Sequence, residues 1–595
     1  MKSFLKMLLA VICGFILMGI LSIFLLSGIA GALALSGKDD KPVVPRSAIL
    51  KIDMSSMIFE EQASSLPQSV SFLKGEKGSV GILDAVMAVN KAADDDAIKL
   101  IYLKTDAANA SLSHIEELRE ALSNFRKTGK PIISYMESPS TGSYYLASVA
   151  DKVLMSSYAG SGPMIFGIGT QMFFLKDILD KFGVNVQLIR HGKYKSAGET
   201  FIKNKPSDEN LEQTREMINS LWNTCSESIA ESRHIDKDKF NRLIDNLSLV
   251  SSEDMLKYNL VDQLVTREEL KEELSKTELN DKFDKSHLIS LSSYIKTLDK
   301  TKGESLKNKI AIIYANGEII DKEDNKQISG NRFARIISEV NADSSIKAVV
   351  LRVSSPGGSV LASDKIKTAL DELAKDKLLV ASYGSYAASG GYWISNNCSK
   401  IFSDKTTLTG SIGVFSIVPD LSGTAKDFLH IGVASVGSNK HSNMMSMMRT
   451  LDKDEINYMQ RSVEDIYSKF VKTVAKGRGL REEYVDSIAQ GRVWSGTDAL
   501  RLGLVDEIGT LETAVKYAAS EIGEDTNDIS GLNIVSYPEQ INEFQALIDL
   551  FDKTGIDEDV LAKTPFKSLI YAFKNCYNEN TNKVLARMPF EYIIR

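Results

Sequence analysis

Cysteine and histidine are scarce in this chain of 595 residues, which contains 4 cysteines and 6 histidines. The cysteines (Cys13, Cys225, Cys398 and Cys576) are scattered and show none of the close spacings that zinc sites use. The histidines are equally dispersed. A zinc site is therefore not expected.

An excess of positive charge is also missing. The net charge is −7 and the sequence has no basic tract, so we expect no nucleic-acid partner. Charged residues make up 25% and hydrophobic residues 43% of the chain, as in ordinary globular proteins. A chain of 595 residues is too long for one hydrophobic core, which predicts two or more domains.

One long uncharged run, Met7–Leu35, covers 29 residues near the start of the chain. As a helix it would be about 43 Å long, against a hydrocarbon core of about 30 Å. Lys2 and Lys6 precede it, so the positive-inside rule places residues 1–6 in the cytoplasm and the rest of the chain on the far side. The alternative is a cleaved signal peptide ending near 32–34. The run exceeds the usual signal core of about 7–15 residues, which favours a transmembrane anchor.

The chain is internally duplicated with an offset of 248 residues. Identical residues recur at this offset in four pairs: Ile98 and Ile346, Tyr135 and Tyr383, Tyr144 and Tyr392, Lys152 and Lys400. At the same offset Ser389 of the second copy aligns with Thr141 of the first. Because only the second copy retains the serine, we expect one composite active site rather than two.

Both copies alternate short apolar strands with amphipathic helices. In the first copy these segments are 48–52, 82–92, 100–104, 112–125 and 132–135; in the second they are 310–314, 332–340, 348–353, 363–373 and 378–382. This alternation predicts an α/β fold built from βα units around a mostly parallel sheet. The strands are apolar almost throughout, as expected when both faces of a sheet are covered.

The pattern also predicts domain boundaries. We expect an N-terminal repeat over 46–290 and a C-terminal repeat over 308–530, with a charged helix and linker over 268–307. A C-terminal extension, 531–595, lies beyond the duplicated pattern. For its last part we favour packing or an oligomer contact over contact with the membrane.

Two glycine pairs follow strands of the second copy. One is Gly357-Gly358, and the other follows Ser389 as Gly390-Gly391 at a predicted helix start. Glycines allow close backbone approach, and N–H groups at a helix start can stabilise an oxyanion. Gly358 and Gly390 are therefore the expected pair of oxyanion donors. Ser389 alone is equally well explained as a helix N-cap, but with the glycine turn and the duplication we favour a nucleophile.

A nucleophilic serine needs a base. No histidine lies within the 40 residues after Ser389, and the next one, His430, lies in an apolar run and is predicted to pack. Lysine is the alternative, since burial can lower the pKa of its amine by several units.

Four motifs taken together resemble the signal peptide peptidase A family in its long, tandem-repeat form. They are Ser355–Gly358, Tyr386–Trp393, Leu408–Gly413 and Gly192–Ala197. The resemblance covers roughly 45–530 and the N-terminal anchor. It implies a membrane-anchored serine protease with a Ser/Lys dyad, two repeats of a crotonase- and Clp-protease-like fold, a tetrameric assembly and no cofactor.

The resemblance also implies a role for individual residues. Ser389 matches the nucleophile, Lys195 the general base and Ser411 the serine that orients the lysine amine. Lys440 is the rival base because it falls near the aligned region, but the motif favours Lys195. Lys193 is predicted to be a solvated neighbour.

The function implied is degradation of cleaved signal peptides, which are apolar peptides left in or near the bilayer. The protein is then expected in the bacterial inner membrane as a single-pass protein, with its catalytic domain on the periplasmic side and in contact with lipid through the anchor. Two alternatives remain open at this point: a crotonase-like acyl-CoA enzyme, since that fold uses similar oxyanion amides, and a non-catalytic membrane-tethered scaffold.

Overall fold

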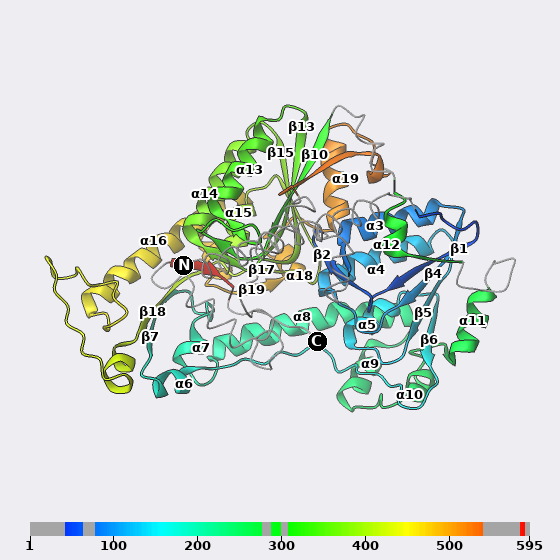
Figure 1. Cartoon of the computed structure of the whole chain (residues 1–595), viewed down its shortest axis with the longest axis horizontal. Coiled ribbons are helices and arrows are strands. Elements are labelled where there is room, and N and C mark those ends of the chain that lie inside the picture. Colours follow the sequence, from blue (N-terminus) through cyan, green and yellow to red (C-terminus); the bar gives the residue numbers. More distant parts are fainter. Residues whose placement is uncertain are drawn as a thin grey trace, which may run out of the picture.

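The fold was analysed in a computed structural model, which describes residues 42–62, 78–276, 287–298, 308–526, 528–539 and 584–588. Among these residues no helix combines the length and apolar character needed to cross a membrane. The anchor expected at Met7–Leu35 lies outside them. Figure 1 shows an elongated α/β protein in which the first copy (blue and cyan) and the second copy (green to orange) lie side by side.

The first copy forms a parallel sheet of strand order β8-β6-β5-β4-β1-β9. Its strands are β1 Ala48–Asp53, β4 Ile98–Lys104, β5 Ile132–Met136, β6 Lys152–Ser156, β8 Gln263–Val265 and β9 Leu288–Ser290. Its helices are α3 Ile82–Asp94, α4 Leu112–Arg126, α5 Thr141–Ala147, α9 Lys237–Asp245, α10 Ser252–Lys257, α11 Arg267–Ser275 and α12 Leu291–Ile295. A short pair, β2 Met57–Glu60 and β3 Gly78–Gly81, precedes α3.

The second copy repeats this order as β16-β15-β13-β10-β21, and β17 and β19 extend it beyond the far end of β15. Its strands are β10 Lys309–Asn316, β13 Ile346–Ser355, β15 Leu378–Ala388, β16 Lys400–Ser403, β17 Leu408–Gly410, β19 Val493–Ser495, β20 Glu507–Ile508 and β21 Asn533–Tyr537. Its helices are α13 Gly330–Ala342, α14 Val360–Leu373, α15 Gly390–Ser395, α16 Lys453–Arg478, α17 Glu482–Ile488, α18 Gly496–Arg501 and α19 Leu511–Glu521. Leu100 and Ala348, 248 positions apart, occupy matching places in the two sheets.

The strands form where the sequence is apolar without interruption. In β13, nine of ten residues are buried, and β15 is buried over most of its length. Helix boundaries follow local capping: Asp452 caps the start of α16 in a capping box, and Gly479 ends it in the left-handed conformation with φ 63°. The α/β fold and the mostly parallel sheet expected from the sequence are therefore present.

A third, mixed sheet joins the two copies. Its order is β12-β11-β14-β22-β18-β7, with β12 Ile328–Ser329, β11 Ile319–Ile320, β14 Gly357–Ser359, β22 Val584–Arg587, β18 Val414–Asp420 and β7 Asn185–His191. Strand β7 belongs to the first copy but pairs antiparallel with β18 of the second along its whole length. Figure 1 shows both at the lower left, far from the other first-copy strands.

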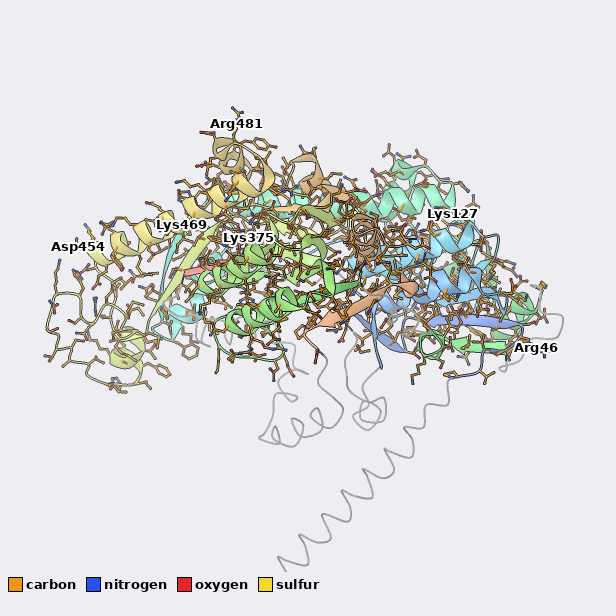
Figure 2. All side chains as sticks on the ribbon, turned by 90° about the horizontal axis from the view of Figure 1, so that it is seen from above. Arg46, Lys127, Lys375, Asp454, Lys469 and Arg481 are labelled. Atoms are coloured by element: carbon orange, nitrogen blue, oxygen red, sulfur yellow. The ribbon has the colours of Figure 1, made fainter. Side chains whose placement is uncertain are left out.

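Helix α8, Asp208–Arg233, returns the chain from this sheet to the first copy (Figure 1). It follows α6 Lys176–Lys181 and α7 Glu199–Ile202, which lie beside β7. Figure 2 places Asp454 of α16 and Arg46, just before β1, at opposite ends of the molecule. The first copy therefore extends along the long axis of the molecule to pair with the second (Figure 1).

A buried ionic network lies between the two copies. Arg352 of β13 donates to Glu61 over 2.6 Å and also pairs with Glu117 of α4. His114 of α4 contacts the other oxygen of Glu61 at 3.1 Å. All four side chains are buried, so the contact between the copies excludes water from these charges.

One expected linker and one expected boundary need correction. The segment 268–307 was expected to be a helix and linker, but β9 within it, inside the expected N-terminal repeat 46–290, pairs with β1 and completes the first sheet. The C-terminal repeat was expected to end at 530, but β21 pairs with β10 in the matching position of the second sheet. Both strands are short, and polar or charged segments surround them, which hides their strand character in the sequence.

Candidate active site

Ser389 lies between β15 and α15, where it is the N-cap of the helix. Its backbone has φ 57° and ψ −114°, a conformation that costs a non-glycine residue about 1–3 kcal/mol. The turn is tight because α15 packs against the end of β13: a Cβ on Gly391 would lie 2.8 Å from the carbonyl oxygen of Ser355. This strained strand-to-helix turn holds the serine hydroxyl at the C-terminal end of the parallel strands.

Lys195 follows β7 and therefore reaches this place from the first copy. Its Nζ lies 2.9 Å from Oγ of Ser389, 3.0 Å from Oγ of Ser411 and 3.1 Å from the Ser411 carbonyl oxygen. Ser411 follows β17, and its hydroxyl also donates to the carbonyl of Gly491 over 3.4 Å. The three side chains singled out by the motifs thus meet in one cluster.

Burial determines the charge of the lysine. Lys195 has no exposed surface, and desolvation lowers the pKa of its amine well below the ordinary value. No carboxylate contributes to the shift, since desolvation is its only cause. Desolvation therefore shifts the amine toward its neutral form, which can accept a proton.

Several residues that the sequence analysis missed hold Lys195 in place. Gln213 of α8 donates to the carbonyl of Tyr194 over 2.9 Å and accepts from the backbone of Val493 over 3.3 Å. Arg190 of β7 donates to the carbonyl of Lys195 over 2.7 Å. These contacts lie around the lysine backbone, so no motif of reactive side chains could have revealed them.

Gly491 packs directly against the lysine. A Cβ there would lie 2.6 Å from the Lys195 Cβ, and its φ of 80° disfavours other residues. Because the glycine belongs to the second copy and the lysine to the first, this contact is part of the junction that carries the site. Its importance is visible only once the two copies are folded together.

The two expected oxyanion donors lie in β14 and at the start of α15. Gly358 lies in β14, where a Cβ would come 2.0 Å from the carbonyl oxygen of Ile319, so no larger residue fits. Gly390 is the first residue of α15, and N–H groups in a first helical turn have no acceptor within the helix.

The rival residues lie elsewhere. Lys440 is exposed and pairs with Asp454, which raises the pKa of its amine above the ordinary value, the opposite of what a base at neutral pH requires. Lys193 is exposed, as expected for a solvated neighbour. Thr141 donates to the carbonyl of Gly167 over 3.0 Å and lines a cavity of 440 Å³ between the copies. His430 was predicted to pack, but it is exposed, so that prediction was wrong.

Within the described ranges one group of potential metal ligands comes together: His441, Asp452 and Glu455, whose ligand atoms lie within 4.8 Å of one another. Arg449 donates to both oxygens of Glu455, so a guanidinium already neutralises that carboxylate. The group is remote in sequence from Ser389 and Lys195. It offers no support for a cation site.

Comparison with known proteins places these observations in context. The profile of peptidase family S49 matches residues 124–280 and 371–524. "Protease 4" of Haemophilus influenzae is 35% identical over 82% of this chain and 81% of its own, and "Protease 4" of Salmonella typhi is 36% identical over 74% and 71%. A "Putative signal peptide peptidase SppA" of Enterococcus faecium is 31% identical over 44% of this chain and 82% of its own. A ClpP1 mutant of Listeria monocytogenes matches 34% of this chain and 94% of its own at 15% identity, with a TM-score of 0.24.

Proposed function

Because the chain belongs to peptidase family S49 and is a serine protease, we propose that Ser389 and Lys195 form its catalytic dyad. The observation that carries the proposal is the distance of 2.9 Å between the lysine Nζ and the serine Oγ, within hydrogen-bonding reach and shielded from water. The shielding matters because only a neutral lysine can act as the general base.

The mechanism follows from the geometry. The neutral amine of Lys195 accepts the proton of Ser389 as Oγ attacks a peptide carbonyl, and the carbonyl electrons move to its oxygen. We propose that the N–H groups of Gly358 and Gly390 stabilise this oxyanion. The lysine then donates its proton to the departing amine nitrogen. Finally it takes a proton from the water that attacks the acyl ester and gives that proton to Oγ as the ester C–O bond breaks, which releases the acid and regenerates Ser389.

Ser411 is proposed to orient the base. Its hydroxyl and its carbonyl oxygen both accept from the lysine amine, at 3.0 and 3.1 Å. With two hydrogens engaged there, the remaining lone pair of the neutral amine points to the hydroxyl of Ser389. No metal ion or organic cofactor has a role in this scheme.

For substrates we propose apolar peptides, in particular signal peptides already cleaved from secreted proteins. One relative bears the name signal peptide peptidase. The walls next to the nucleophile are also apolar: Ala388 packs with Leu408, Val493 and, from α8, Met217 and Leu221. Such walls favour side chains that leave water on binding.

We further propose that the protein is a single-pass protein of the bacterial inner membrane with its catalytic part in the periplasm. The long uncharged run over 7–35 and the preceding lysines support this proposal. An anchor of this kind would hold the protease at the bilayer, where apolar peptides partition.

A homo-oligomer, specifically a tetramer, is proposed as the assembly. Two exposed apolar stretches support it, one in each copy. They comprise Met164, Phe166, Phe173, Ile178 and Phe182 in the first, and Phe428, Leu429, Ile431, Val433 and Val436 in the second. Exposed apolar surface of this extent is typical of contact surfaces.

The dyad is tested with purified Ser389→Ala and Lys195→Ala variants and an apolar fluorogenic peptide. Each substitution should abolish cleavage and leave the elution volume in size-exclusion chromatography unchanged. Full activity in either variant would remove the dyad assignment. Wild-type Ser389 should also be labelled by a fluorophosphonate, which a crotonase-like enzyme or a scaffold would not be.

A further inference from the structure

The cleft beside the nucleophile contains a segment of the chain itself. Strand β22, from the C-terminal extension, lies between β14 and β18 and pairs antiparallel with both (Figure 1, red). Gly357 is opposite Arg587 and Gly358 is opposite Ala586. The strand thus runs along the glycine turn that holds one of the proposed oxyanion donors.

This pairing is the one that an extended peptide substrate would use. Peptides commonly bind by adding a strand to a sheet edge, with backbone hydrogen bonds for affinity and pockets for alternate side chains. Without β22, strands β14 and β18 would have no partner on their facing edges, since β11 and β7 pair with their other edges. The gap between these two edges therefore has the width of one strand.

Met588 fixes the direction and depth of the insertion. Its N–H donates to the carbonyl of Pro356 over 2.7 Å, which continues the pairing one residue beyond β22. Its side chain is buried at 2% exposure among Met217, Leu221, Ala388, Leu408 and Val493. Ala388 immediately precedes the nucleophile in the chain, so the apolar pocket that Met588 fills includes the residue next to Ser389.

We propose that residues 584–588 form a tethered pseudosubstrate, which occupies the peptide cleft of the protease and inhibits it until a substrate strand displaces them. The proposal rests on the proposed peptidase function. It also defines the preferred substrate: an extended chain with a long, unbranched or leucine-like apolar side chain in the pocket that Met588 fills. With the strand in place Ser389 and Lys195 are fully buried, as expected of a closed cleft.

The sequence explains why such a segment would persist uncleaved. Met588 is followed by Pro589, so the bond after the buried methionine is a tertiary amide. The proline ring places a carbon where an ordinary scissile bond has a hydrogen, and it restricts the conformation of the residue before it. A cleft shaped for secondary amides would bind this strand and turn it over slowly.

The test compares the full-length wild-type chain with Met588→Asp, Met588→Leu and, as a matched surface control, Val250→Asp. Val250 is exposed in the first copy, remote from the cleft. A carboxylate cannot enter the apolar pocket, so Met588→Asp should raise kcat/KM for an apolar fluorogenic peptide, and the rate of fluorophosphonate labelling, by about tenfold or more. Met588→Leu and Val250→Asp should change neither rate by more than about twofold.

A peptide spanning residues 580–590 should inhibit Met588→Asp by raising KM at constant kcat, and the same peptide with aspartate at position 588 should not. Unchanged rates in Met588→Asp would overturn the proposal, as would an intact mass showing that the wild-type chain ends at Met588. Hydrogen exchange in the Ser389→Ala background tests whether residues 584–588 occupy the cleft, independently of whether the protein is a peptidase. If the backbone amides of 357–359 are protected from exchange and Met588→Asp removes this protection, the strand occupies the cleft, even if no variant cleaves peptides. Exchange that Met588→Asp leaves unchanged would overturn the pseudosubstrate proposal.

Discussion

Nε of Arg352 donates a hydrogen bond of 2.6 Å to Oε2 of Glu61, although 291 positions separate the two residues in the sequence. The arginine comes from the central strand of the second sheet and the glutamate from the segment after β2. Neither side chain contacts solvent to any extent. Glu117 pairs with the same guanidinium. Burial alone would lower the pKa of Arg352, but the carboxylates of Glu117 and Glu61 raise it above its ordinary value. The ion pair therefore lies at the centre of the contact between the copies.

Replacing Arg352 by alanine should destabilise the protein by about 3–5 kcal/mol, because two buried carboxylates lose their partner. Urea unfolding followed by circular dichroism measures the change. Arg126→Ala provides the control, since Arg126 pairs with Asp151 at the surface and its loss should cost about 1 kcal/mol or less. Equal losses in the two variants would show that the buried network contributes nothing special.

Peptide cleavage should fall as the pH is lowered through the pKa of Lys195. Burial lowers that pKa, so the unprotonated base is present above it and is lost below it. The pH profile of kcat/KM reports this value for the free enzyme. Lys440→Ala should leave the profile unchanged, because that exposed amine pairs with Asp454. A rate that rises on acidification would contradict the role of a neutral lysine.

The same shift has a consequence for stability. Between the lowered pKa of folded Lys195 and the ordinary value of about 10.4, the unfolded chain binds a proton that the folded chain does not. The contribution of Lys195 to the free energy of unfolding therefore increases with pH between these two pKa values. Lys195→Met should remove this dependence and raise the free energy of unfolding at neutral pH by about 0.5–2 kcal/mol, while abolishing cleavage. Thermal unfolding of both proteins at several pH values measures the difference. A Lys195→Met variant that is less stable than the wild type at neutral pH would contradict this prediction.

Ser389→Gly and Ser389→Ala should both be inactive but should differ in stability. The φ of 57° at this position strains alanine and not glycine. We expect the glycine variant to be the more stable by about 1 kcal/mol. Denaturation midpoints with equal m-values provide the comparison, and a more stable alanine variant would argue against backbone strain at the nucleophile.

Ser411→Ala should reduce kcat by about tenfold, the loss of one hydrogen bond that orients the base. It should also move the midpoint of the pH profile to lower pH. The Ser411 hydroxyl accepts from the lysine amine, and an acceptor favours the charged form; its removal lowers the lysine pKa further. A purely structural role would reduce the rate without moving the midpoint.

Much of the architecture was accessible from the sequence because it depends on local patterns. The strands at 100–104 and 348–353 are continuous apolar runs, and the structure has them in β4 and β13. Ser389 was identified from the glycines that follow it. One of them, Gly391, lets the turn pack closely against the end of β13.

The remainder depends on contacts between distant segments. Lys195 came from a motif rather than from any pattern in its surroundings, since β7 is only partly buried and carries alternating polar residues. Gly491 packs against Lys195 of the other copy, and Gln213 bonds the backbone of Tyr194 in its own copy and of Val493 in the other. Strand β22 is four residues long in a segment without periodicity, so nothing in the sequence indicated that it would enter the cleft.

The pairing of β7 with β18 also restricts how this gene could have evolved. After duplication each half was free to lose one reactive group, but once a loss had occurred neither half could serve alone. A polypeptide severed between the copies would yield two inert fragments, and hydrolysis would return only on mixing them.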